Sequence, residues 1–102
     1  MSEIQPVTLS LQAAAEVKKI MDSKKIPAGY GLRVGVRGGT GCGAAQLVIG
    51  FDKPHEGDIT YDQFGVTVHV DKKHVLYVFG KQVDFYEGAD ARGFHFADKP
   101  AA

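Results

Sequence analysis

The chain has 102 residues, of which 44% are hydrophobic, a size and composition typical of one globular domain, which we place over residues 1–102. Its 12 basic and 12 acidic residues give a formal net charge of zero, which argues against nucleic-acid binding and against recruitment to an anionic membrane. The sequence has no apolar run of about 18 residues and no signal-peptide pattern at its start, so we expect a cytoplasmic protein.

The first part of the chain predicts a helix followed by a hairpin. Ser10 is a suitable N-cap, and apolar residues recur at helical spacing over residues 11–24. Residues 32–37 alternate between apolar side chains and arginine or glycine, which indicates a half-buried strand, and residues 46–49 are typical of a second strand. We expect these two strands to pair as a hairpin.

The rest of the chain predicts four more strands and a short helix. Residues 59–61 and 66–70 indicate a second hairpin, whose valines face the core. Asp71 is a suitable cap for a short helix, and two alternating segments, residues 83–85 and 94–96, follow as strands. The predicted fold class is α+β and β-rich, with about six strands and two small helices.

The only cysteine lies in a glycine-rich stretch, residues 38–43, in which four of the six residues are glycine. Glycine at this density lets backbone amides turn toward one point, and amides that converge on sulfur favour the thiolate, which binds metals. Cys42 is therefore a candidate ligand. The alternative is a hairpin loop in which Cys42 is only a small side chain. Phosphate-binding and dinucleotide-binding glycine motifs do not fit, because a predicted strand and not a helix follows the glycines.

Five segments follow one another across most of the chain. They are the opening helix at 10–17, the strand at 31–37 that leads into the Gly/Cys stretch, residues 65–71, Gly-Lys-Gln-Val-Asp-Phe at 80–85 and Gly-Phe-His-Phe at 93–96. In this order they resemble the A-type iron-sulfur carriers of the HesB-like family. The resemblance implies a compact β-sandwich-like fold, a dimer or tetramer as the working state, and a role in assembling or delivering iron-sulfur clusters.

The resemblance also implies a ligand, although the sequence departs from the family's pattern. Members hold iron or a cluster with one cysteine in the glycine loop and a Cys-x-Cys pair on a C-terminal arm. Residues 97–102, where this arm is expected to begin, contain no cysteine. An alignment without gaps from Arg37 puts the family's loop cysteine at Gly41, one residue before Cys42. The resemblance implies Cys42 as a ligand for iron or for a 2Fe-2S cluster shared between subunits, with no metal at all as the alternative.

Histidine ligates some iron-sulfur centres, so each of the four histidines is a candidate ligand. His55 lies in a predicted turn, His69 on the outward side of a valine-rich strand and His74 in the short helix, and we expect all three to face solvent. His95 is the stronger candidate for a metal ligand, because it precedes the point where the family's ligand arm leaves the domain. Against it, polar residues on edge strands usually only meet water.

We expect a carrier rather than an enzyme, because no spacing of catalytic side chains can be identified. The leading hypothesis is a divergent accessory or carrier protein of iron-sulfur cluster assembly that works through Cys42 with assembly or client proteins. The alternative is a metal-free interaction or structural module, for which Arg33 and Arg37 on one strand face are candidate contacts; otherwise we expect this face to be solvated. A redox-active thiol is a third interpretation, and it lacks a second cysteine to resolve it.

We also expect a homodimer with Cys42 near the subunit interface. A domain of this size buries only about two thirds of its unfolded surface, and short strands leave unpaired edges that association covers. One thiolate per subunit approaches the four ligands of a cluster only by pairing, and another protein, glutathione or His95 is needed to complete the set.

Overall fold

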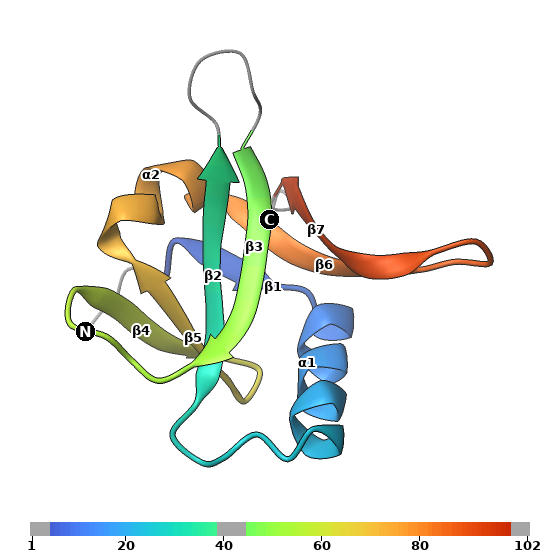
Figure 1. The fold of residues 1–102 in the computed structure, drawn as a ribbon. Coiled ribbons are helices and arrows are strands. Elements are labelled where there is room, and N and C mark those ends of the chain that lie inside the picture. Colours follow the sequence, from blue (N-terminus) through green and yellow to red (C-terminus); the bar gives the residue numbers. More distant parts are fainter. Residues whose placement is uncertain (1–4, 39–44, 99–102) are drawn as a thin grey trace.

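The computed structural model describes residues 5–38 and 45–98 and contains two β-sheets and two helices (Figure 1). A short 3₁₀ helix, η1, precedes the second helix. In chain order the elements are β1 (Val7–Leu9), α1 (Leu11–Ser23), β2 (Gly31–Gly38), β3 (Ala45–Asp52), β4 (Asp58–Gln63), β5 (Val66–Asp71), η1 (Lys72–His74), α2 (Val75–Val78), β6 (Lys81–Glu87) and β7 (Arg92–Asp98).

The larger sheet has the strand order β3-β2-β5-β4. β2 and β3 form an antiparallel hairpin whose register runs from Gly31 opposite Asp52 to Gly38 opposite Ala45. β4 and β5 form a second antiparallel hairpin, and β5 runs parallel to β2. Both hairpins expected from the sequence are confirmed, and each was recognisable because its two strands are adjacent in the chain.

The smaller sheet has the strand order β1-β6-β7. β6 and β7 are antiparallel, whereas β1 lies parallel to β6, with Val7 opposite Lys81. The sequence prediction missed β1, because three residues are too few to show an alternating pattern. The described ranges therefore contain seven strands, one more than expected, and the β-rich α+β class is confirmed.

Ser10 caps α1 as predicted. Its Oγ accepts a hydrogen bond from the backbone N–H of Ala13 at 3.0 Å and donates one to Asp84 Oδ1 of β6 at 2.6 Å. The cap therefore fixes the start of the helix and also ties it to the smaller sheet. The helix ends at Ser23, one residue before the predicted end. Neither helix in the described ranges is long and apolar enough to cross a membrane.

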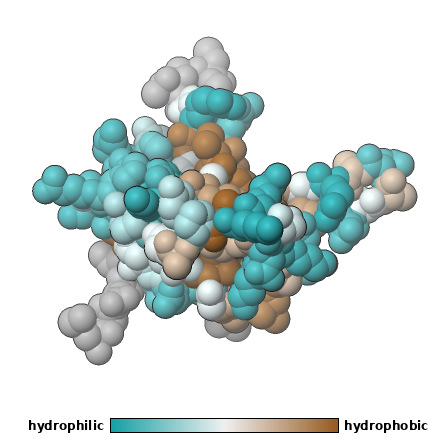
Figure 2. Space-filling view, turned by 60° about the horizontal axis from the view of Figure 1, so that its bottom comes forward, coloured by the Kyte–Doolittle hydropathy of each residue, from teal (hydrophilic) through white to brown (hydrophobic). Residues whose placement is uncertain are grey.

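The core draws on both sheets and both helices. The valines of β5 that were expected to face inward, Val66, Val68 and Val70, are at most 2% exposed. Several other hydrophobic residues pack against this core but are only partly buried. One face of the molecule accordingly shows apolar surface between hydrophilic flanks (Figure 2).

Candidate functional site

Cys42, the ligand predicted from the sequence, lies outside the described residues, and so does Gly41. On either side of this segment the structure describes two paired strand ends, where Gly38 of β2 is opposite Ala45 of β3. Gly38 has a φ of 76°, which is favourable for glycine and strained for other residues. The role of Cys42 stays a prediction from sequence.

His95, the second predicted ligand, lies in β7 opposite Asp84 of β6. Its side chain is exposed, and its Nδ1 lies 3.3 Å from the carbonyl oxygen of Phe96. The neighbouring Phe94 points to the other side of the strand, where its ring meets that of Phe85 edge-on at 4.9 Å between centroids. His95 is therefore accessible to an external group.

The described residues do not surround His95 with a ready metal site. They contain no group of three or more His, Cys, Asp or Glu side chains that could hold a metal ion. A metal bound at His95 would therefore need ligands from residues outside the described ranges, from a second subunit or from another molecule.

The prediction that His69 faces solvent is wrong, because its residue is only 1% exposed. β5 lies between β2 and β4, and Thr60 Oγ1 of β4 lies 2.9 Å from His69 Nδ1. On the other side the ring lies against Gly31 of β2, where an added Cβ would come within 2.8 Å of Nε2. Burial first, and then the charge of Arg33, lowers the pKa of His69. The imidazole is a structural element of the sheet and is inaccessible to a cluster.

His55 is exposed, as expected, whereas His74 lies at the surface but is only partly exposed. His74 is half-buried, because its ring lies on Gly35 of β2, in space that any other residue at position 35 would need for its side chain. His55 is exposed in the turn after β3, with its Nε2 3.0 Å from Asp52 Oδ2. The helical spacing around His74 could not show this contact, which comes from a strand about 40 residues earlier in the chain.

Arg33 is engaged in a network of ion pairs rather than solvated as expected. Its Nη1 and Nη2 donate to the two carboxylate oxygens of Asp58 at 2.8 and 2.7 Å, and its Nε donates to Asp52 Oδ2 at 3.3 Å. The two hydrogen bonds from Arg33 to Asp58 are the main reason why the pKa of Asp58 is lowered to about 2. Arg37 of the same strand is exposed. Of the two arginines proposed for partner contacts, only Arg37 therefore presents its guanidinium to solvent.

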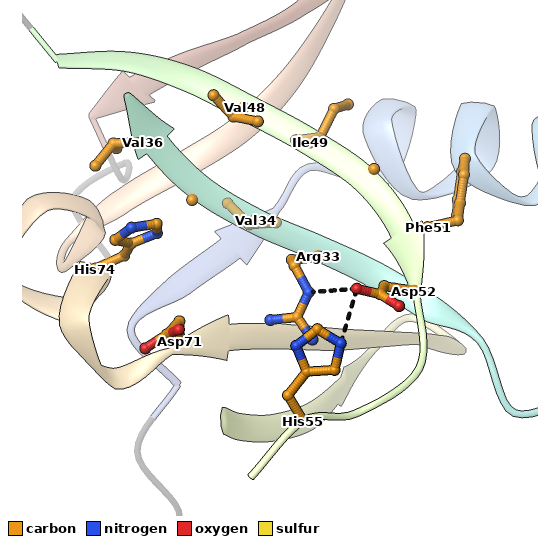
Figure 3. Close-up of a pocket in the computed structure, with 12 residues that line it drawn as sticks. Arg33, Val34, Val36, Val48, Ile49, Phe51, Asp52, His55, Asp71 and His74 are labelled. Atoms are coloured by element: carbon orange, nitrogen blue, oxygen red, sulfur yellow. Dashed lines mark hydrogen bonds and ion pairs between the residues drawn. The ribbon is translucent and has the colours of Figure 1, made fainter. Parts of the chain in front are cut away.

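A hollow of about 300 Å³ lies on the outer side of the β2–β3 hairpin (Figure 3). Gly35 and Gly50 are part of its lining, with His74 at one end and the Arg33–Asp52–His55 contacts at the other. The positive charge of Arg33 is neutralised by its carboxylate partners, and the imidazoles do not form a metal cluster with the acids described around them. The described residues of the hollow therefore do not form a metal site.

Comparisons with known proteins identify relatives of this chain by sequence and by structure. No family model matches the chain. The iron-sulfur cluster insertion protein ErpA of Aliivibrio fischeri is 39% identical over 104 residues, which cover 100% of this chain and 89% of that protein. The iron-binding protein IscA of an Enterobacter species is 37% identical over 93 residues, covering 90% of this chain and 84% of that protein.

A solved structure agrees with these relatives. The crystal structure of SufA from Escherichia coli, involved in the biosynthesis of iron-sulfur clusters, matches with a TM-score of 0.75 and 26% identity, over 96% of this chain and 84% of that chain. Sequence and architecture thus agree across nearly the whole chain. The chain belongs to the A-type iron-sulfur carrier family.

Proposed function

We propose that this protein is an accessory or carrier protein of iron-sulfur cluster assembly, which binds iron or a 2Fe-2S cluster weakly as cargo. The observation that carries the proposal is its similarity to a cluster insertion protein over its whole length, at 39% identity. The protein acts as a carrier and not as an enzyme, in the cytoplasm, and its partners are assembly proteins and client proteins that receive the cargo.

Cys42 is the residue that we propose as the cargo ligand. It is the only cysteine among the 102 residues, and soft thiolate sulfur is the ligand that iron-sulfur clusters prefer. Because a cluster takes four such ligands, we propose a homodimer in which each subunit supplies one thiolate. Glutathione, another protein or the exposed His95 completes the set. With only half of the ligands supplied by the two thiolates, the binding is weak and the cargo is readily passed on.

Anaerobic reconstitution with iron and sulfide tests this proposal. We expect the protein to gain visible charge-transfer absorption, and Cys42→Ala to abolish it, because no other thiol is present in the chain. If His95 is a ligand, His95→Ala lowers the yield of bound iron, while His55→Ala, which removes another exposed imidazole, serves as the matched control and leaves the yield unchanged. A colourless wild-type protein, or colour retained in Cys42→Ala, would reject the ligand assignment.

A metal-free interaction module is the second candidate function. It is favoured by the single thiol and by the absence of a metal-binding group of His, Cys, Asp or Glu from residues 5–38 and 45–98. If it is correct, the wild-type protein stays colourless in the same reconstitution, and partner binding survives Cys42→Ala but weakens in Arg37→Ala. One set of variants therefore separates the two functions.

A further inference from the structure

β3 is an outer strand of the larger sheet, and its free side can accept a further strand. The strand order β3-β2-β5-β4 gives it a neighbouring strand on one side only (Figure 1). In an antiparallel pair, alternate residues turn their N–H and C=O groups away from the partner strand. Within the described part of the chain, the backbone of residues 45–52 makes no hydrogen bond except to β2. The outward backbone groups of β3 are therefore available to another strand.

The other outer strands are protected against such pairing, whereas β3 is not. Natural proteins usually protect an outer strand by shortness, charged side chains, proline or a bulge. β1 has only three residues, and β4 carries Asp58 and Asp62. β7 carries Arg92 and Asp98. β3 has eight residues, contains no proline, pairs with β2 without a bulge and carries no charge before Asp52.

The inward-facing side chains of β3 are covered less well than those directly opposite them on β2. Leu32 and Val34 of β2 are fully buried. Their partners in register, Phe51 and Ile49 of β3, pack against the core but remain partly exposed. The apolar inner face of the sheet thus continues to the free side of β3. A strand added there gains apolar contacts as well as backbone hydrogen bonds.

The hollow on the outer side of the β2–β3 hairpin supplies a pocket for one side chain of an added strand. Gly50 of β3 is part of its lining, and a Cβ added at Gly50 would meet no atom within 4 Å. Neighbouring strands lie about 4.8 Å apart, so a long side chain opposite Gly50 can extend across it into the hollow. Strand addition combines backbone hydrogen bonds with side-chain pockets of this kind.

The charge of the hollow favours a basic side chain. Asp52 and Asp71 line it, and no lysine is among its described lining residues. Arg33 also lines the hollow, but it is already paired with Asp52 and with Asp58 behind it. Three carboxylates around one guanidinium leave negative charge in excess. A lysine or arginine is therefore attracted to the hollow, and a glutamate is repelled.

We propose that the free side of β3 binds an extended segment of a partner protein by strand addition. The segment has apolar side chains at alternate positions, beside Ile49 and Phe51, and a lysine or arginine opposite Gly50. The choice of a cluster-receiving client as the partner rests on the proposed function, because Ala45, the first residue of β3, is only three positions after Cys42 in the chain. The choice of surface rests on β3 and the hollow alone.

A synthetic peptide tests strand addition on the reduced, metal-free protein. The probe has about ten residues, alternates valine with threonine, and carries lysine at one central threonine position. We expect fluorescence anisotropy to show binding of the labelled peptide. A peptide with two of its valines replaced by proline should not bind, because proline cannot join a strand ladder. Hydrogen exchange followed by NMR should show new protection at alternate amides of residues 46–52, which a side-chain contact alone would not give.

Two glycine variants form a matched pair for this test. Gly50 of β3 and Gly93 of β7 both lie in outer strands, and a Cβ added at either position meets no atom within 4 Å. Gly50→Leu fills the floor of the hollow and should raise the dissociation constant of the peptide about tenfold. Gly93→Leu should leave it unchanged. Replacing the lysine of the peptide with glutamate should weaken binding to the wild type about tenfold as well.

Four outcomes overturn the inference: no binding of the lysine peptide, equal binding of the proline peptide, equal binding by Gly50→Leu and the wild type, or no new protection in β3. Far-ultraviolet circular dichroism checks that both variants are folded. Sedimentation with and without the peptide tests a second copy of the chain as the occupant. If the peptide binds only by dissociating a dimer, the free side of β3 belongs to that second copy and the inference is also wrong.

Parallel reconstitution with iron and sulfide separates this inference from the proposed function. A protein that binds the peptide but stays colourless keeps strand addition and rejects the cargo. A protein that gains colour but does not bind the peptide keeps the cargo and rejects strand addition.

Discussion

His69 is held neutral inside the larger sheet, and this makes it sensitive to acid. Its Nε2 has no hydrogen-bond partner among the described residues, and Arg33 is a nearby positive charge. Protonation would place a cation in a buried position beside that guanidinium. Asp58 and Asp52 attract such a cation, but burial has the larger effect, so the pKa of His69 lies below the usual 6.5.

This pKa predicts how stability depends on pH. In the unfolded chain the imidazole takes up its proton at a higher pH than in the folded protein, so acid favours unfolding. The stabilising contribution is fully present above about pH 6.5 and is lost as the pH falls below it. Asp58 does not contribute to this change, because its pKa of about 2 keeps it ionised throughout. We expect the urea midpoint to fall between about pH 7.5 and pH 5.5.

His69→Gln is the variant that isolates this effect. Glutamine does not titrate, so its urea midpoint should change less with pH than that of the wild type. Identical pH dependence in the two proteins would show that His69 is not the responsible group.

The sequence placed His69 on the correct side of its strand but in the wrong environment. Alternation separates it from Val68 and Val70, as the structure confirms through its contact with Thr60. What alternation cannot show is that β5 becomes an inner strand, or that Gly31 leaves room for the ring. Arg33 was expected to be solvated, and its ion pair could not be read from the strand pattern, because its partner Asp58 is 25 residues away in the chain.

At the scale of elements, the turn between β4 and β5 carries a residue that its geometry does not favour. Gln63 pairs with Val66, so the turn consists of Phe64 and Gly65, both with positive φ, at 51° and 83°. Two-residue hairpin turns of this kind prefer Asn-Gly. A bulky residue in the left-handed region is strained by roughly 1–2 kcal/mol. Burial of the Phe64 side chain offsets little of this strain, because the residue is 54% exposed.

Phe64→Asn should therefore stabilise the protein by about 0.5–1 kcal/mol, measured as a higher urea midpoint. Phe64→Ala is the matched control, because it removes the ring without supplying a residue that favours positive φ. If alanine stabilises as much as asparagine, the gain comes from removing exposed apolar surface and the turn argument is wrong.

The sequence predicted those elements whose pattern is local. α1 was recognised from Ser10 and its helical spacing, and the strands of both hairpins from alternation next to turn-forming residues. β1 was missed because Val7–Leu9 forms a strand only by pairing with β6 near the other end of the chain. Of the candidate site, the exposure of His95 was anticipated, while the partial burial of His74 depends on contact between separate elements.

At the scale of the whole molecule, Tyr61 joins the two sheets. Its hydroxyl, on β4 of the larger sheet, donates to the carbonyl oxygen of Val7 at 2.6 Å and accepts from the N–H of the same residue at 3.2 Å. Burial raises the pKa of Tyr61 to about 12, so the hydroxyl keeps its proton at neutral pH. The tie gives both the N–H and the carbonyl oxygen of Val7 in β1 a hydrogen-bond partner on the other sheet.

Tyr61→Phe should lower the free energy of unfolding by about 1–3 kcal/mol, because it leaves two polar groups of Val7 unsatisfied. Urea denaturation measures this difference. The control is Tyr86→Phe, at a tyrosine that is 55% exposed, where the change should be close to zero. Equal effects of the two substitutions would argue against a link between the sheets.

The parallel pairing of β1 with β6 also has a consequence for synthesis on the ribosome. β1 is among the first segments to emerge, yet Val7 pairs with Lys81, a residue made 74 positions later. Until then the β2–β3 and β4–β5 hairpins can form, since each joins strands that are neighbours in sequence. The nascent chain therefore carries β1 as an unpaired apolar strand for most of its translation. The smaller sheet closes only when the C-terminal hairpin has left the exit tunnel.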